Sequence, residues 1–124
     1  MKNLSTVALL CALVVNTAHL RGGQRLAIRV SPTVAVAPAV LTVRTTIEPS
    51  DENRMLNLLV DSPTYHRSSE IPLNGKNAQR VSNFELKGLP AGVYEVRAVL
   101  VGQSGPIANA MQLAKVAQGA GYDR

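Results

Sequence analysis

The fold is decided by the stretch Gly88-Leu89-Pro90-Ala91-Gly92-Val93-Tyr94-Glu95-Val96-Arg97-Ala98-Val99-Leu100. A turn made of Gly and Pro leads directly into a run in which side-chain character alternates. Apolar residues recur at every second position from Tyr94 to Leu100, whereas Glu95 and Arg97 fall at the positions between them. Successive side chains of a strand leave opposite faces of a sheet, so this period of two predicts a half-buried β-strand.

Similar short runs recur along the chain about every 8 to 14 residues, separated by turns rich in Gly, Pro, Asn and Asp. They cover residues 25–30, 33–37, 40–47, 55–60, 65–71, 80–86, 93–101 and 107–116. Pro32 and Pro38 interrupt the second run, which indicates a sheet edge because proline cannot donate to the ladder. The continuously apolar run 55–60 favours a central strand, and the polar run 65–71 favours an exposed edge strand. We therefore predict an all-β, antiparallel sandwich of about seven strands over residues 25–117.

The N-terminus has the composition of an export signal. Lys2 precedes an almost wholly apolar run at residues 4–17, and the small residue Ala18 follows. This pattern predicts a signal peptide over residues 1–18, a flexible lead at 19–24 and, at the other end, a disordered tail at 118–124. An uncleaved anchor helix is the alternative, although residues 4–20 are at the short limit of a membrane span. A lipoprotein attached through Cys11 is disfavoured because the bulky Leu10 precedes it. Either main reading predicts an extracytoplasmic protein that is periplasmic, secreted or membrane-anchored.

Composition excludes several kinds of function. Cys11 is the single cysteine, so a chain without its leader has no disulfide, no thiolate-bound zinc and no thiol nucleophile. The chain has 13 Lys and Arg against 8 Asp and Glu, a net charge of +5, but the cations are scattered singly. Nucleic-acid binding usually needs a clustered basic stripe with stacking aromatics, and aromatic residues make up 3% here. We expect no nucleic-acid partner, and membrane association only if the N-terminal segment is retained.

One segment resembles a known family. The residues Leu89-Pro90-Ala91-Gly92-Val93-Tyr94-Glu95-Val96-Arg97 are similar to the turn and penultimate strand of immunoglobulin-like and fibronectin type III-like domains of exported bacterial-type proteins. The resemblance implies that Tyr94 forms a structural tyrosine corner, with its ring over the core and its hydroxyl bonded to nearby backbone. The paired cysteines and core tryptophan of true immunoglobulin domains are missing. Such sandwiches mostly serve as spacers, adhesion modules or attachments to enzymes.

Residues that could carry catalysis or bind a metal do not form a recognisable pattern. A triad could be drawn from Ser68 or Ser69, His66 and Glu70 or Asp61, but adjacent residues of a strand face opposite sides and no nucleophile elbow is present. Asp51 and Glu52 are too few for a calcium site and are typical of a solvated turn. The sequence therefore predicts no enzyme activity, no cofactor and no metal.

The segment Tyr65-His66-Arg67 combines an aromatic, a histidine and an arginine, and it is the candidate contact surface for a partner. The predicted function is a non-enzymatic, exported structural or protein-interaction module, an accessory subunit of a cell-envelope assembly. The alternative is a module that binds carbohydrate or another ligand. That alternative depends on Tyr65, because sugar sites stack their rings on exposed aromatic side chains.

Overall fold

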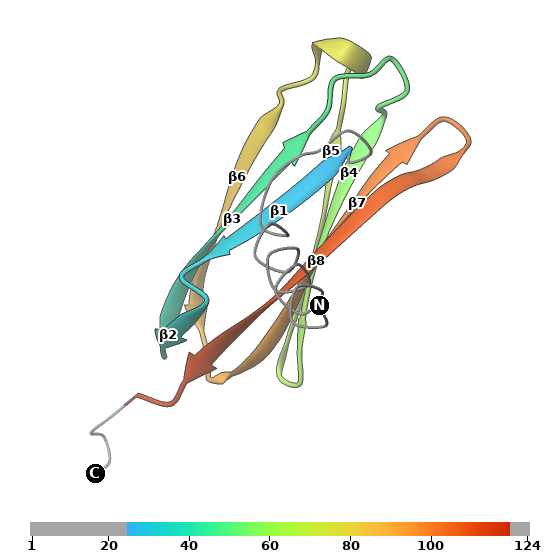
Figure 1. Cartoon of the computed structure of the whole chain (residues 1–124). Coiled ribbons are helices and arrows are strands. Elements are labelled where there is room, and N and C mark those ends of the chain that lie inside the picture. The colour runs from blue at the N-terminus through green and yellow to red at the C-terminus, as the bar shows by residue number, and fades with distance from the viewer. Residues whose placement is uncertain (1–24, 120–124) are drawn as a thin grey trace, which may run out of the picture.

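The computed structural model describes residues 25–119, which form two β-sheets packed face to face (Figure 1). The strands are β1 (Leu26–Ser31), β2 (Val34–Val36), β3 (Ala39–Ile47), β4 (Met55–Ser62), β5 (Tyr65–Pro72), β6 (Val81–Leu89), β7 (Gly92–Gly102) and β8 (Gly105–Ala117). A single 3-10 turn, η1 (Gly75–Asn77), interrupts them. The all-β, two-layer prediction is confirmed. The predicted leader or anchor helix, the lead at 19–24 and most of the tail lie outside the described residues.

The two sheets differ in size. β1, β3 and β6 form a three-stranded sheet, and β2, β8, β7, β4 and β5 form a five-stranded sheet in that order. β4 lies between β7 and β5, and β5 lies at one edge, as its composition predicted. β2 lies at the other edge, where its flanking prolines are tolerated.

One detail of the predicted sandwich is wrong. The described residues form eight strands, one for each predicted run, but the sheet pairing is not wholly antiparallel. β2 runs parallel to β8, with Val34 opposite Lys115 and Val36 opposite Ala117. The chain leaves the three-stranded sheet at Pro32 and crosses to the other sheet, so its 33–37 segment is a strand of its own. Its partner lies some 80 positions along the chain, which local alternation does not reveal.

The core lies between the sheets and follows the alternation of the strands. Tyr94, Val96, Ala98 and Leu100 of β7 all point inward and are fully buried. The other fully buried large side chains are Val30, Leu41, Val43, Ile47, Leu56, Leu58, Val60, Leu86 and Leu89. Burying a side chain of this size contributes about 1.5–3 kcal/mol each, so this aliphatic layer stabilises the sandwich without any crosslink.

One side chain joins the two sheets where β1 passes β8. The carboxamide of Gln112 accepts a hydrogen bond from the Val30 amide (3.0 Å) and donates one to the Val30 carbonyl (3.2 Å). It thereby satisfies both backbone groups of a buried residue at the free edge of β1. A side-chain amide here takes the place of a neighbouring strand.

Candidate functional site

The structure places the three predicted contact residues at one end of β5 but divides them between its two faces. Tyr65 is half-buried and points inward, where its ring meets the ring of Tyr94 edge-to-face with centroids 5.8 Å apart. His66 is exposed on the outer face of β5. Arg67 lies on the inner face, but it is exposed because β5 is an edge strand. The three side chains therefore do not form one surface. The ring of Tyr65 is used in packing, which removes the platform that the carbohydrate alternative required.

His66 has a single side-chain partner among the described residues. Its Nδ1 lies 2.5 Å from Oδ1 of Asp61, the residue directly opposite it on β4. Both side chains are more than half exposed, so water screens the pair and its contribution to stability is small. Among residues 25–119, no serine hydroxyl is hydrogen-bonded to His66, so these residues do not form the geometry of a catalytic triad.

Tyr94 lies where the resemblance placed it. Its side chain is fully buried, and its hydroxyl donates a hydrogen bond to the carbonyl oxygen of Pro90, four residues upstream, at 2.5 Å. Burial raises the pKa of the Tyr94 phenol above its usual value. The side chain is inaccessible and supports the turn between β6 and β7 rather than a binding surface.

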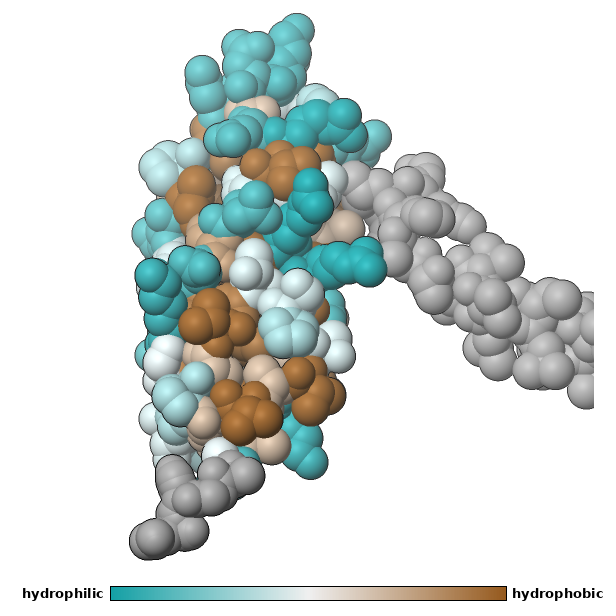
Figure 2. All heavy atoms as spheres, turned by 90° about the vertical axis from the view of Figure 1, so that its left-hand side faces the viewer, coloured by the Kyte–Doolittle hydropathy of each residue, from teal (hydrophilic) through white to brown (hydrophobic). Residues whose placement is uncertain are grey.

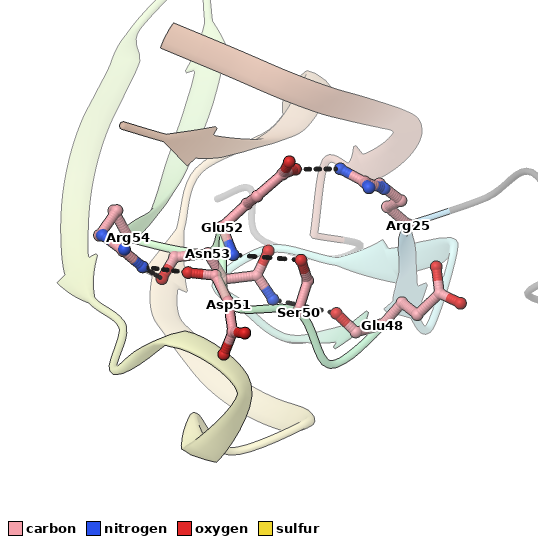
Figure 3. A network of polar contacts seen from close by, with 7 residues as sticks. All are labelled: Arg25, Glu48, Ser50, Asp51, Glu52, Asn53 and Arg54. Carbon is pink, nitrogen blue, oxygen red and sulfur yellow. Dashed lines mark hydrogen bonds and ion pairs between the residues drawn. The ribbon is translucent and has the colours of Figure 1, made fainter. Parts of the chain in front are cut away.

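The turn between β3 and β4 contains a network of polar contacts (Figure 3). Asn53 is fully buried, and its side-chain Nδ2 donates to the carbonyl of Glu48 at 2.9 Å. The backbone amide of Glu52 donates to Oγ of Ser50 at 3.1 Å, and Arg54 donates to the carbonyl of Asp51. Sequence reasoning missed Asn53 because an asparagine in a turn usually faces water.

This network ties the turn to the start of β1 in the three-stranded sheet. The guanidinium of Arg25, which immediately precedes β1, lies 2.9 Å from the carboxylate of Glu52. Residues 25–119 hold no group of three or more His, Cys, Asp or Glu side chains placed to bind a metal. These contacts stabilise the conformation of the β3–β4 turn. We therefore assign the network a structural role rather than a role in binding.

The most distinctive surface lies at the β2 edge of the five-stranded sheet. Large apolar side chains stand on its outer face, each more than half exposed, up to 65% for Val34. We call this the β2–β8 edge surface; its residues are Val34, Val36, Val93, Met111, Leu113 and Lys115. The β2 end of this surface lies on the side seen in Figure 2, where apolar side chains occupy the lower half at the place of β2 and the beginning of β3 in Figure 1.

The sheet register explains why these side chains gather. Val34 of β2 and Val93 of β7 flank Lys115 of β8 on either side. The inward positions of β8 are Ala114 and Val116, which are buried, so Leu113 and Met111 must face outward with Lys115. Residues from three strands, β2, β7 and β8, thus form one apolar surface around Lys115.

The backbone of β2 adds free hydrogen-bonding groups to this surface. The Lys115 amide donates to the Thr33 carbonyl and the Ala37 amide donates to the Ala117 carbonyl, each at 2.8 Å. The alternate residues Val34 and Val36 therefore direct their N–H and C=O groups away from β8. Within the described part of the chain, no strand pairs with that side of β2. An exposed edge of this kind is a template for an added strand.

The charge of the surface is positive. Lys115 is exposed and forms no ion pair with any carboxylate of residues 25–119. The neighbouring carboxylate on β7, Glu95, is bonded to Arg97 on its own strand. The sequence signal for this site was the pair of valines at alternate positions between two prolines, in a segment too short to suggest which face it would show.

The strand arrangement defines the class of fold. One sheet holds the first, second and fifth long strands, and the other holds the third, sixth and seventh, as in the sheets of immunoglobulin domains. β5 pairs with β4 and so extends the larger sheet. The chain is an all-β sandwich whose two sheets are arranged as in immunoglobulin-like folds. No helix in the described residues has the length and apolar character needed to span a bilayer.

Comparison with known proteins supports this class and no narrower one. No protein-family model and no curated protein matches the chain. Among solved structures, a variant of the superoxide reductase (neelaredoxin) from Ignicoccus hospitalis is similar over 75% of this chain and 80% of its own, with 19% identity and a TM-score of 0.59. The sulfur carrier protein SoxY from Chlorobium limicola f thiosulfatophilum is similar over 92% of this chain and 98% of its own, with 11% identity and a TM-score of 0.56. At these identities the likeness shows the fold alone.

These neighbours correct one prediction. We predicted from the sequence that the chain is not an enzyme, and that prediction is contradicted because superoxide reductases are enzymes with this fold. The prediction rested on the lack of a recognisable catalytic or metal-binding pattern in the sequence, and such a lack does not exclude catalysis. A fold hosts many functions and selects none, so the sandwich gives no ground for excluding catalysis.

Proposed function

We propose that the chain is an exported protein-interaction module, an accessory subunit of a cell-envelope assembly, which binds its partner through the β2–β8 edge surface. The observation that carries the proposal is the group of apolar side chains beside the free backbone edge of β2. Gathered apolar residues with a polar surround typically mark interaction sites on soluble domains. Export is supported by the composition of residues 1–18, with Lys2 before an apolar run and Ala18 after it.

The chemistry of the surface specifies the partner. The outward N–H and C=O groups of Val34 and Val36 fit an extended segment that adds as a strand. The side chains of Leu113 and Met111 fit aliphatic residues at alternate positions of that segment. The ammonium of Lys115, which has no carboxylate partner within residues 25–119, fits an Asp or Glu among them, because opposite charges across an interface fix its register. The partner therefore presents an extended, aliphatic segment that carries a carboxylate.

Site-specific crosslinking in the producing cells tests this proposal. A photoreactive phenylalanine analogue replaces Leu113 in one full-length variant and Ser68 in a control variant, which lies on the outer face of the same sheet near its opposite edge. We expect a crosslink from position 113 to an extended acidic segment of another envelope protein, and none from position 68. A crosslink from position 113 to a second copy of this chain, or equal crosslinking from both positions, would overturn the proposal.

The affinity of variants of this chain for the purified partner tests the same proposal quantitatively. Leu113→Glu buries a charge at the centre of the interface and is expected to weaken binding about 10- to 100-fold, whereas Ser68→Glu adds the same charge without effect. Lys115→Glu is expected to weaken binding by slowing association. Unchanged affinity in Leu113→Glu would contradict the assignment of the surface.

A further inference from the structure

Two arginines oppose each other on the outer face of the three-stranded sheet. Arg29 of β1 is the register partner of Arg44 of β3, and both side chains are exposed. The Glu48 amide donates to the Arg25 carbonyl at 3.0 Å, so the hydrogen-bonded pairs of this ladder fall at the odd positions of β1. Arg29 and Arg44 are therefore such a pair, and their Cα atoms are about 5.5 Å apart. Both guanidinium groups stand on the same face.

No carboxylate of the described residues neutralises this pair. The ion pairs of residues 25–119 involve Arg25, His66, Lys87 and Arg97 as cations. The nearest carboxylate by register is that of Glu85, which lies opposite Thr42 and pairs with Lys87 at 3.6 Å. Like charges directly opposite one another destabilise an antiparallel pair. An anion between the two side chains would relieve this repulsion.

The surroundings of the pair supply further donors. Arg29 and Arg44 line a hollow together with the hydroxyl residues Ser31 and Thr46. Asn83 lies opposite Arg44 on the third strand of the sheet. Each guanidinium presents five N–H donors in a planar fork whose geometry matches two oxygens of a phosphate group. The hollow therefore combines charge, hydrogen-bond donors and the right geometry for an oxyanion.

We propose that Arg29 and Arg44 form a binding site for a phosphate group, which bridges the two guanidinium groups. The phosphate is either a free ion or the headgroup of an anionic lipid. The site shares no residue with the β2–β8 edge surface, so it stands independently of the proposed function.

Titration of the full chain with inorganic phosphate, at an ionic strength held constant with chloride, tests the site. We expect Arg29→Gln and Arg44→Gln each to raise the Kd about 10-fold, from the loss of one charge-assisted contact. Arg67→Gln is the matched control, since Arg67 is exposed on β5 and removes the same charge. An equal loss in Arg67→Gln, or an unchanged Kd in both test variants, would show non-specific attraction and overturn the proposal.

A charge reversal separates binding from folding. Arg29→Glu places opposite charges across the ladder, so it is expected to raise the thermal midpoint in chloride while abolishing any further rise with phosphate. A midpoint that still rises with phosphate in this variant would count against the site.

Vesicles of phosphatidylglycerol in phosphatidylcholine, compared with phosphatidylcholine alone, identify the source of the phosphate. Binding of the anionic vesicles that depends on Arg29 and Arg44 supports a lipid headgroup, and binding of inorganic phosphate alone supports a free ion. Failure of both probes to bind through these arginines refutes the site.

Discussion

Removing the hydroxyl of Tyr94 is the sharpest test of how this sandwich is held together. The hydroxyl donates to the Pro90 carbonyl at 2.5 Å from a fully buried ring. Tyr94→Phe keeps the ring and deletes only this hydrogen bond. Pro90 is exposed, so water can partly replace the lost donor at its carbonyl. We expect the free energy of unfolding to fall by about 1 kcal/mol, within the range for one intramolecular hydrogen bond.

Urea denaturation followed by far-ultraviolet circular dichroism measures this change, since the chain has no tryptophan to report by fluorescence. For a domain of this size the same loss lowers the thermal midpoint by about 4–8 °C. Tyr65→Phe is the matched control: its ring packs against Tyr94, and its hydroxyl makes no hydrogen bond with residues 25–119. Equal losses in the two variants, or no loss in Tyr94→Phe, would refute the account of the corner.

Three further predictions concern the same framework. Because burial raises the pKa of Tyr94, the folded state holds this proton more tightly than the unfolded chain, so the stabilisation present below about pH 10 is lost as the pH rises through the folded pKa. Urea midpoints across alkaline pH should fall less steeply in Tyr94→Phe than in the wild type, and parallel curves would contradict this. Asn53→Ala removes the buried donor to Glu48 and is expected to cost about 1–3 kcal/mol in urea denaturation, whereas a cost below about 0.5 kcal/mol would place the side chain in solvent. Gln112→Ala leaves both backbone groups of Val30 without a partner, so amide hydrogen exchange at Val30 should accelerate, and unchanged protection would show that another group satisfies them.

Strand positions and faces were predictable because alternation is a local property. The run from Tyr94 to Leu100 lies along β7 with its apolar side inward, as the period of two required. The polar run at 65–71 became the edge strand β5. The same rule also predicts that Tyr65 and His66 face opposite ways, so treating them as one contact surface overlooked the alternation on which the fold prediction relied.

Partners across the sheets were not predictable from local pattern. Nothing near Arg29 in the sequence indicates that Arg44 lies opposite it, because that pairing depends on the register of β1 against β3. Asn53 has the composition of a solvated turn, and its burial depends on a carbonyl five positions earlier being turned toward it. The register between β1 and β3, and the burial of Asn53, are set by the folded structure and not by the neighbouring sequence.

The amino-acid sequence alone determined that this chain forms extended strands with one apolar side each, because side-chain alternation acts between near neighbours. Only the tertiary structure decided which strands meet. It set β2 parallel to β8, and it thereby brought Val34, Lys115 and Val93 together on one exposed surface. Pairing of this kind joins residues far apart in the chain, and its energy comes from the packing of the whole sandwich rather than from any segment of it.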